Sequence, residues 1–246
     1  MSGHSKWSTI KRKKGAADAK RSKVFSKLIK EIMIAARDSG PDPETNPKLR
    51  LCIANAKGVN MPKDNITRAI SKASSDDAKL DELTFEGYGP GGVAIFVECL
   101  SNNNNRTVGS VRATFNKRGG SLGTNGSLSF LFDRKGVFSI PKGELDIDEF
   151  ELEMIDVGAE DIEVEEGIIT VTCVLEDFGS CQKKLEEMGI EAESAELQRI
   201  PTTTKEADLE TAKSVMTMIE AFEDDDDVQN VFHNLELTDE IAEALA

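Results

Sequence analysis

The chain has few of the residues from which catalytic and metal sites are usually built. Only two of its 246 residues are histidine, His4 and His233, and they stand at opposite ends of the sequence. They do not form the ligand pattern of a zinc site or part of a recognisable Ser-His-Asp triad. The phosphate-loop pattern GxxxxGK followed by Ser or Thr is absent, and the carboxylates are too dispersed to single out an acid–base pair. We therefore predict a protein that is not an enzyme and has no cofactor or metal, with an unrecognised enzyme as the most distant alternative.

Long apolar runs and signal-peptide features are also missing. No stretch is long and apolar enough to cross a bilayer, and the basic N-terminus lacks an apolar h-region. The basic segment runs directly into a predicted core helix, so we treat it as part of the mature protein, and we expect a cytoplasmic protein with no membrane partner and no small-molecule substrate. Four cysteines without a CxxC pair stand mostly in apolar runs, which indicates reduced core residues: Cys52, Cys99, Cys173 and Cys181. A monomer is the working hypothesis for the oligomeric state.

Acidic residues are scarce in the first 75 residues, and basic residues are scarce in the rest of the chain. Residues 1–75 carry 17 basic and six acidic side chains, a net charge of +11, whereas residues 76–246 carry 13 basic and 39 acidic ones, a net charge of −26. We call the basic residues 1–75 the head and the acidic residues 76–246 the body. Such a molecule orients itself on a polyanion, because the head is attracted while the body is repelled. The asymmetry favours directed docking on nucleic acid.

The first thirty residues are the most basic stretch, with ten Lys or Arg and one Asp. Residues 1–17 show no helical or strand period, which predicts a mobile arm. From Asp18 apolar residues recur at helical spacing. Four lysines fall on the opposite face along about 15 Å of helix axis, and we call them the lysine face: Lys20, Lys23, Lys27 and Lys30. We predict that this face binds phosphates, with an ordinary solvated face as the alternative. Trp7 either stacks on a base or pins the arm. The candidate nucleic-acid-binding residues here are Lys6, Trp7, Lys11, Arg12, Lys13, Lys14, Lys20, Arg21, Lys23, Lys27 and Lys30.

Two more helices complete an all-helical basic unit. Asn46 as N-cap and Pro47 at the first helical position open one that ends near Gly58, and Pro62 opens the next. A polar linker is predicted for residues 74–82. The glycines of residues 86–92 then match GxGxxG, but a β-rich run follows instead of a helix. We interpret this stretch as a glycine loop that feeds a strand, not as a dinucleotide site.

The stretch from Asn102 to Arg106 ends that strand, and Thr107 is the expected N-cap of a helix that bears Arg112. Four asparagines and an arginine could contact an RNA loop or phosphates, or could form a polar turn, and the sequence leaves both open. Arg106 and Arg112 join the candidate nucleic-acid-binding residues. A further strand is predicted over residues 128–132 from their alternating apolar side chains.

Residues 136–200 follow the β-α-β-β-α-β order of a ferredoxin-like fold. Strands are predicted at 137–140, 161–164, 168–174 and 195–200, and helices at 147–157 and 181–188. A last helix at 206–222 and a strand at 228–233 enclose the acidic turn Glu223–Asp227. That turn lacks the glycine-punctuated alternation of a calcium loop, and we expect it to be solvated.

Eight short stretches together resemble the YebC/PmpR family, whose eukaryotic relatives are mitochondrial translational activators. They occur in the family's order and are Gly3–Trp7, Asp18–Arg21, Phe25–Leu28, Asn60–Lys63, Glu86–Gly92, Asn105–Thr107, Gly119–Gly120 and Asp133–Gly136. The resemblance implies an α+β fold of three domains, a helical N-terminal one and two ferredoxin-like α/β ones with the third inserted in the second. On that pattern the domains are residues 1–76, residues 77–133 plus 205–246, and the insertion 134–204.

The resemblance implies a non-enzymatic regulator of gene expression, since members are described as DNA-binding transcriptional regulators and as translation factors on ribosomes. We favour a translation factor associated with ribosomal RNA in the ribosome, because rRNA clefts offer dense phosphate with little need for base readout. A transcriptional regulator on duplex DNA is the alternative. No helix-turn-helix with an evident recognition helix is legible, and neighbouring duplex would repel the acidic body.

Overall fold

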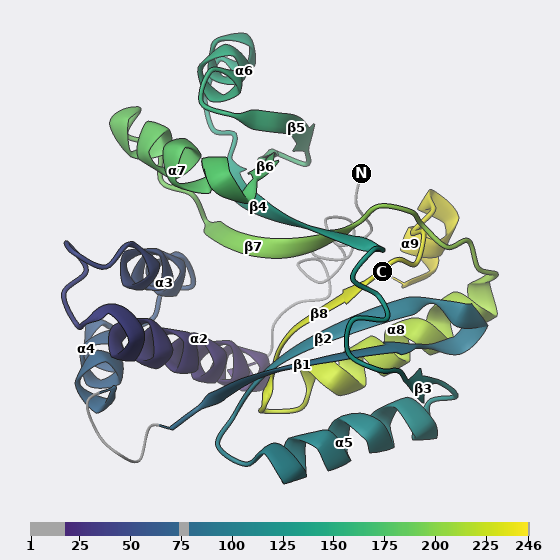
Figure 1. Cartoon of the computed structure of the whole chain (residues 1–246). Helices are drawn as coiled ribbons and strands as arrows, with labels where there is room; N and C mark the ends of the chain where they lie inside the picture. Colours follow the sequence, from purple (N-terminus) through teal and green to yellow (C-terminus); the bar gives the residue numbers. More distant parts are fainter. Residues whose placement is uncertain (1–17, 74–78, 246) are drawn as a thin grey trace.

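The computed structural model describes residues 18–73 and 79–245, which form an α+β structure with helices and two four-stranded antiparallel sheets (Figure 1). Three helices precede the first sheet, and the second sheet is built from residues that lie between two segments of the first. Figure 1 places the helical unit beside both sheets.

The helical unit consists of α2 (Asp18–Ser39), α3 (Pro47–Gly58) and α4 (Lys63–Lys72). Their apolar stripes meet in one core that contains Ile32, Leu49 and Ala69. The predicted start of α3 is confirmed, since Pro47 is its first residue and the Asn46 side chain accepts a hydrogen bond from the Leu49 N–H.

Asn46 also fixes the turn that precedes α3. Its side chain is buried, and its Nδ2 donates to the carbonyl oxygens of Ala35 and Gly40, both at 2.7 Å. One amide therefore satisfies the end of α2, the loop and the start of α3, three places where helix termini leave backbone groups without partners.

The first sheet has the strand order β3-β1-β2-β8. Its strands are β1 (Asp81–Tyr88), β2 (Ala94–Ser101), β3 (Ser121–Leu122) and β8 (Val228–His233). Helices α5 (Asn104–Lys117) and α8 (Leu209–Glu223) cover one face, where Phe115 and Phe222 pack edge to face with ring centroids 4.8 Å apart. The 3-10 turn Pro90–Gly92 joins β1 to β2, and α9 (Asp239–Leu245) closes the described chain.

The second sheet has the order β5-β6-β4-β7, the split β-α-β arrangement expected from the predicted element order. Its elements are β4 (Phe132–Pro141), α6 (Ile147–Ile155), β5 (Ala159–Glu165), β6 (Ile168–Val174), α7 (Phe178–Glu187) and β7 (Ser194–Pro201), with a 3-10 turn at Leu175–Asp177. The predicted order is confirmed, and the boundaries shift by a few residues, most at the start of β4.

The other face of the first sheet is covered by the loop of residues 123–131. Leu128 is fully buried there against Phe96 and Phe232. The strand predicted for residues 128–132 is wrong, since the chain turns as far as Leu131. The reason is Glu86 of β1, whose buried carboxylate accepts the N–H groups of Gly126 at 2.7 Å and Leu128 at 2.5 Å. Those N–H groups are then not free for a ladder.

Strand β1 replaces the end of the predicted linker. Residues 74–78 lie outside the described part, whereas Asp81 and Glu82 already pair with Ser101 and Leu100 of β2. Three acidic residues and a glycine among the eight residues of β1 obscured its β character in the sequence.

All four cysteines are buried and free, as predicted. Burial raises the pKa of Cys52 and of Cys99 to about 12, so both thiols stay protonated near neutral pH. They act as small apolar core residues.

The helical unit contacts the second sheet at β7. The Asn55 side chain exchanges two hydrogen bonds with the backbone of Ala195, donating to its oxygen at 2.9 Å and accepting from its N–H at 3.0 Å. A Cβ added to Gly58 would lie 2.3 Å from the Glu193 carbonyl oxygen, so the end of α3 approaches this segment as closely as backbone allows.

Replacing Asn46 with alanine should lower the free energy of unfolding by about 2–4 kcal/mol, because it removes a cap and leaves two buried carbonyl groups without a donor. Urea denaturation of the full chain measures this. The exposed Asn116→Ala is the control and should stay within about 0.5 kcal/mol of the parent. Equal effects of the two substitutions would show that the Asn46 network contributes nothing.

Candidate nucleic-acid interface

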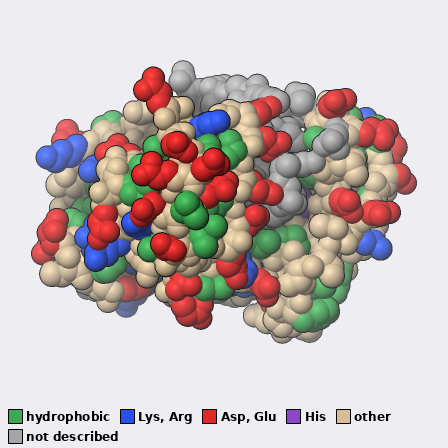
Figure 2. Space-filling view, turned by 90° about the horizontal axis from the view of Figure 1, so that it is seen from above, with side chains coloured by type: hydrophobic (Ala, Val, Ile, Leu, Met, Phe, Trp, Pro, Cys, Tyr) green, Lys and Arg blue, Asp and Glu red, His purple; other side chains and the backbone are tan. Residues whose placement is uncertain are grey.

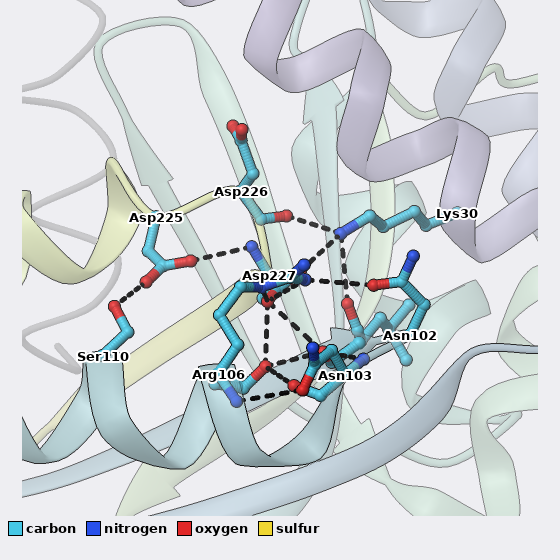
Figure 3. A network of polar contacts seen from close by, with 11 residues as sticks. Lys30, Asn102, Asn103, Arg106, Ser110, Asp225, Asp226 and Asp227 are labelled. Carbon is cyan, nitrogen blue, oxygen red and sulfur yellow. Dashed lines mark hydrogen bonds and ion pairs between the residues drawn. The ribbon is translucent and has the colours of Figure 1, made fainter.

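The predicted lysine face of α2 lies against the turn between α8 and β8. Lys23 Nζ donates to the Asp224 carboxylate at 2.8 Å, and Lys27 Nζ donates to the Gln229 carbonyl oxygen at 3.4 Å. Lys30 Nζ donates to the Asp226 carbonyl oxygen at 2.6 Å (Figure 3). These three amines therefore contact the acidic turn, although the Lys23 side chain is still 41% exposed, whereas that of Lys30 is 21% exposed.

Asp227 is the centre of this contact. Its buried carboxylate accepts hydrogen bonds from Arg106 Nη2 at 2.6 Å, Arg106 Nε at 3.1 Å and Thr107 Oγ1 at 2.8 Å, while Lys30 Nζ lies 3.4 Å away (Figure 3). Burial by itself would raise the pKa of Asp227. The hydrogen bonds from Arg106 and Thr107, with the charges of Lys30 and Arg106, outweigh that effect and hold the pKa below its ordinary value.

The acidic turn is thus only partly solvated, contrary to the expectation from its sequence. The Asp224 side chain is 75% exposed, whereas that of Asp227 is 9% exposed. Asp225 accepts a short hydrogen bond from Ser110 of α5 and another from the backbone N–H of Asp227. The turn joins α2, α5 and β2 through its carboxylates, since Ser101 of β2 also donates to Asp227.

Three of the four consecutive asparagines have partners within the chain. Asn103 caps α5 by accepting from the Arg106 N–H, Asn102 Oδ1 accepts from Arg106 Nη2 at 3.1 Å, and Asn104 Nδ2 donates to Asp81 at 3.0 Å. These contacts favour the polar-turn interpretation of the stretch. The role of Arg106 in nucleic-acid binding stays a prediction, although its guanidinium is half-exposed beyond the pair with Asp227.

The remaining candidates divide into two groups. Those from Lys6 to Lys14 lie outside the described residues, and the structure describes only the backbone of Lys20 and Arg21. Arg112 is exposed on α5, a helix without any acidic residue, and Lys117 and Arg118 are exposed at its end.

The three exposed cations of α4, Lys63, Arg68 and Lys72, were not among the candidates predicted from the sequence. The apolar stripe of this helix could have predicted their exposure, because residues outside the stripe face solvent.

A buried carboxyl group lies behind the lysine face, where α2 meets β2 and β7. Glu31 of α2 has a pKa raised to about 7 by burial, with the charge of Glu196 adding to the effect and the charges of Lys27 and Lys48 opposing it. Glu98 of β2 raises it further. Glu31 is thus a titratable group at the junction of the helical unit and both sheets.

We expect Lys30→Met to lower the free energy of unfolding by about 1–3 kcal/mol, because it leaves the buried Asp227 without one of its cations. The side chain of Lys30 is 21% exposed, whereas that of Lys23 is 41% exposed and pairs with a solvated carboxylate. Lys23→Met should therefore cost less than about 1 kcal/mol. Denaturation of both variants measures the difference, and equal small losses would contradict the burial argument.

The raised pKa of Glu31 predicts a loss of stability as pH rises. Between about 4.5 and 7 the folded state binds more protons than the unfolded state, so the free energy of unfolding falls across this window. Glu31→Gln should remove that loss and be more stable than the parent near pH 8 by up to roughly 3 kcal/mol, with a smaller difference near pH 5. The exposed Glu149→Gln is the control. A difference that does not change with pH would refute the assignment.

No group of three or more His, Cys, Asp or Glu side chains in residues 18–73 and 79–245 is placed to hold a metal ion. Among the helices described, none is both long enough and apolar enough to span a bilayer.

Solved and curated proteins resemble this chain along nearly its whole length. A protein of Amoebophilus asiaticus (strain 5a2) named "Probable transcriptional regulatory protein" is 54% identical over 239 residues, 96% of this chain and 98% of its own. "Probable transcriptional regulatory protein YebC" of Escherichia coli O6:H1 is 47% identical over 249 residues, all of both chains. The crystal structure of a conserved hypothetical protein from Aquifex aeolicus matches with a TM-score of 0.83 and 42% identity, covering 90% of this chain and 93% of that one.

Two family models match consecutive parts of the sequence. The model of the TACO1/YebC protein N-terminal domain matches residues 5–76, which include the helical unit with its lysine face. The model of the TACO1/YebC second and third domain matches residues 80–235, from β1 to beyond β8. Together with the relatives, these matches show that the chain belongs to the TACO1/YebC family.

Proposed function

We propose that this chain is a non-enzymatic, nucleic-acid-binding regulator of gene expression that acts in the cytoplasm on ribosomal RNA in the ribosome. The observation that carries the proposal is the separation of charge between exposed cations and an acidic body. Residues 1–75 carry a net charge of +11, with Lys63 and Arg68 exposed on α4, whereas residues 76–246 carry a net charge of −26. Within that acidic segment Arg112, Lys117 and Arg118 are a local basic exception on α5 and at its end. Exposed cations attract phosphate, whereas the acidic remainder of residues 76–246 repels it.

The contact between α2 and the acidic turn shapes how the basic region would be used. Lys27 and Lys30 are partly buried in it, so they serve mainly to hold the helical unit in place. The cations left for phosphate are then the residues from Lys6 to Lys14, together with those exposed on α4 and α5. Nucleic acid would contact a surface formed by the helical unit and α5, whose relative position is fixed by the contacts of Lys30 and Arg106 with Asp227.

We further propose that the chain is organised as three domains, residues 1–76, residues 77–133 plus 205–246, and the insertion 134–204. Separate hydrophobic clusters support this division. One is built around Leu49 in the helical unit, one around Phe115 beneath the first sheet, and one around Phe138 and Phe150 in the second sheet.

A transcriptional regulator on duplex DNA is the second candidate, and it is favoured by the names of the relatives from Amoebophilus asiaticus and Escherichia coli. The two functions differ in target. Co-sedimentation of the native protein with ribosomes at near-physiological salt, run beside a shift assay on duplex DNA, separates them. Retention on ribosomes without a duplex shift supports the translation role, and the reverse result overturns it in favour of DNA.

The salt dependence of rRNA binding should report a phosphate-dominated contact. If about five phosphates are neutralised, log affinity against log salt should slope by roughly −3.5 to −4.5. The full-length variant K11Q/R12Q/K13Q/K14Q should bind more weakly with a flatter slope. A matched loss of four charges on the acidic body, K79Q/K142Q/K183Q/K213Q, should leave both nearly unchanged. A flat slope in the parent, or equal losses in the two variants, would refute the basic arm as the main phosphate contact.

A further inference from the structure

Phe130 is a large aromatic side chain left in solvent. It is 71% exposed, the highest value among the exposed large apolar side chains of the described chain. It stands on the loop 123–131, within a run from Gly119 to Phe132 that contains no charged residue. Lys117 and Arg118 precede this run, and Asp133, Arg134 and Lys135 follow it. Lys135 pairs with Glu160 at 2.6 Å, so the exposed cations on either side are Lys117, Arg118 and Arg134.

The backbone that carries Phe130 is fixed on both sides. Before it, the Glu86 carboxylate holds the N–H groups of Gly126 and Leu128, and the Leu128 side chain is fully buried. After it, the Leu131 N–H donates to the Leu128 oxygen at 2.9 Å, and the Leu131 oxygen accepts from the Thr202 N–H, also at 2.9 Å. The loop is therefore ordered before any ligand arrives, which lowers the entropic cost of binding.

The other strongly exposed apolar side chains have a different setting. Leu152 and Ile155 of α6 and Val164 of β5 lie within residues 143–182, a stretch with 14 acidic residues and no basic one. Figure 2 shows this kind of surface, with hydrophobic side chains among many Asp and Glu. Such a surface repels a phosphate backbone, whereas the uncharged loop with its basic flanks does not.

An exposed aromatic ring on an uncharged loop, with Arg118 before the loop and Arg134 after it in the sequence, matches the chemistry by which proteins hold single-stranded nucleic acid. Bases stack on the ring whatever their identity, and nearby cations contact the phosphates. In a duplex the bases already stack on one another, so a protruding ring has access only to unpaired ones. The exposed side chains of Thr124 and Asn125 on the same loop add hydrogen-bonding groups at the edge of such a base.

We propose that Phe130 is a stacking platform for an unpaired nucleobase of RNA, presented by the loop that Glu86 fixes. The inference rests on the proposed function and names the class of ligand: a single-stranded stretch of RNA, bound with little sequence preference. Glu86 is a positioning residue for this contact, since it holds the backbone of the loop and does not reach the base.

The test uses the full chain and two fluorescein-labelled eight-residue probes, an oligouridylate and a backbone of the same length without bases. The parent should bind the oligouridylate more tightly than the abasic probe. Phe130→Leu, which keeps an apolar side chain but removes the ring, should weaken oligouridylate binding by roughly 5- to 150-fold and abolish the preference. Phe130→Tyr should restore binding to within about threefold. Leu152→Ala is the control at an exposed apolar site and should bind like the parent.

A direct readout comes from placing tryptophan at the site. In the variant Trp7→Phe with Phe130→Trp the single indole lies on the loop, and stacking on uracil should quench its fluorescence when the oligouridylate is added but not when the abasic probe is added. Thermal melts of each variant confirm that the loop substitutions leave the fold intact.

The outcomes separate the two proposals. Oligouridylate binding that is unchanged in Phe130→Leu, or an abasic probe that binds the parent as tightly as the oligouridylate, overturns the stacking site while the nucleic-acid function stands. A parent that binds neither probe nor ribosomes overturns both.

Discussion

The ion pair between Asp227 and the cations around it determines where the helical unit sits. Arg106 approaches this carboxylate from α5 and Lys30 from α2, so one buried anion joins segments nearly two hundred residues apart. A buried carboxylate is unfavourable without compensation, and here hydrogen bonds from Arg106, Thr107 and Ser101 supply it. The lysine face therefore has a structural role in addition to any contact with phosphate.

This arrangement changes the meaning of the charge asymmetry. Opposite net charges in the head and the body can orient the protein on a polyanion, and they also attract each other. Because exposed ion pairs contribute little, it is the burial at Asp227 and Lys30, not the total charge, that makes the contact specific. Salt would screen the exposed pair of Lys23 and Asp224 first and leave the buried one largely intact.

Local patterns predicted much of the fold. The cap at Asn46, the strand 228–233 and the β-α-β-β-α-β order all follow from short-range rules of capping and periodicity, and the structure contains them. The missed strand β1 has a local cause, its acidic residues and glycine. The failures at residues 128–132 and at the lysines of α2 share another cause, which is partners distant in sequence. Nothing near Leu128 indicates that Glu86 will bind its N–H, and nothing near Lys30 indicates Asp227. A helical period shows which residues share a face but not what packs against that face. The sequence therefore predicted which cations form the candidate site, but not which of them stay exposed.

The pairing of Asn55 with Ala195 has a consequence for solubility. Strand β7 is at the edge of its sheet, and an edge offers free peptide groups on which a strand from another molecule can add. The Asn55 amide presents the same donor and acceptor as a peptide, and it occupies both groups of Ala195. The end of α3 also lies close to the Glu193 carbonyl group, so the Asn55 side chain occupies the position at which an added strand would begin to pair. The helical unit thus protects this edge from association between copies of the chain.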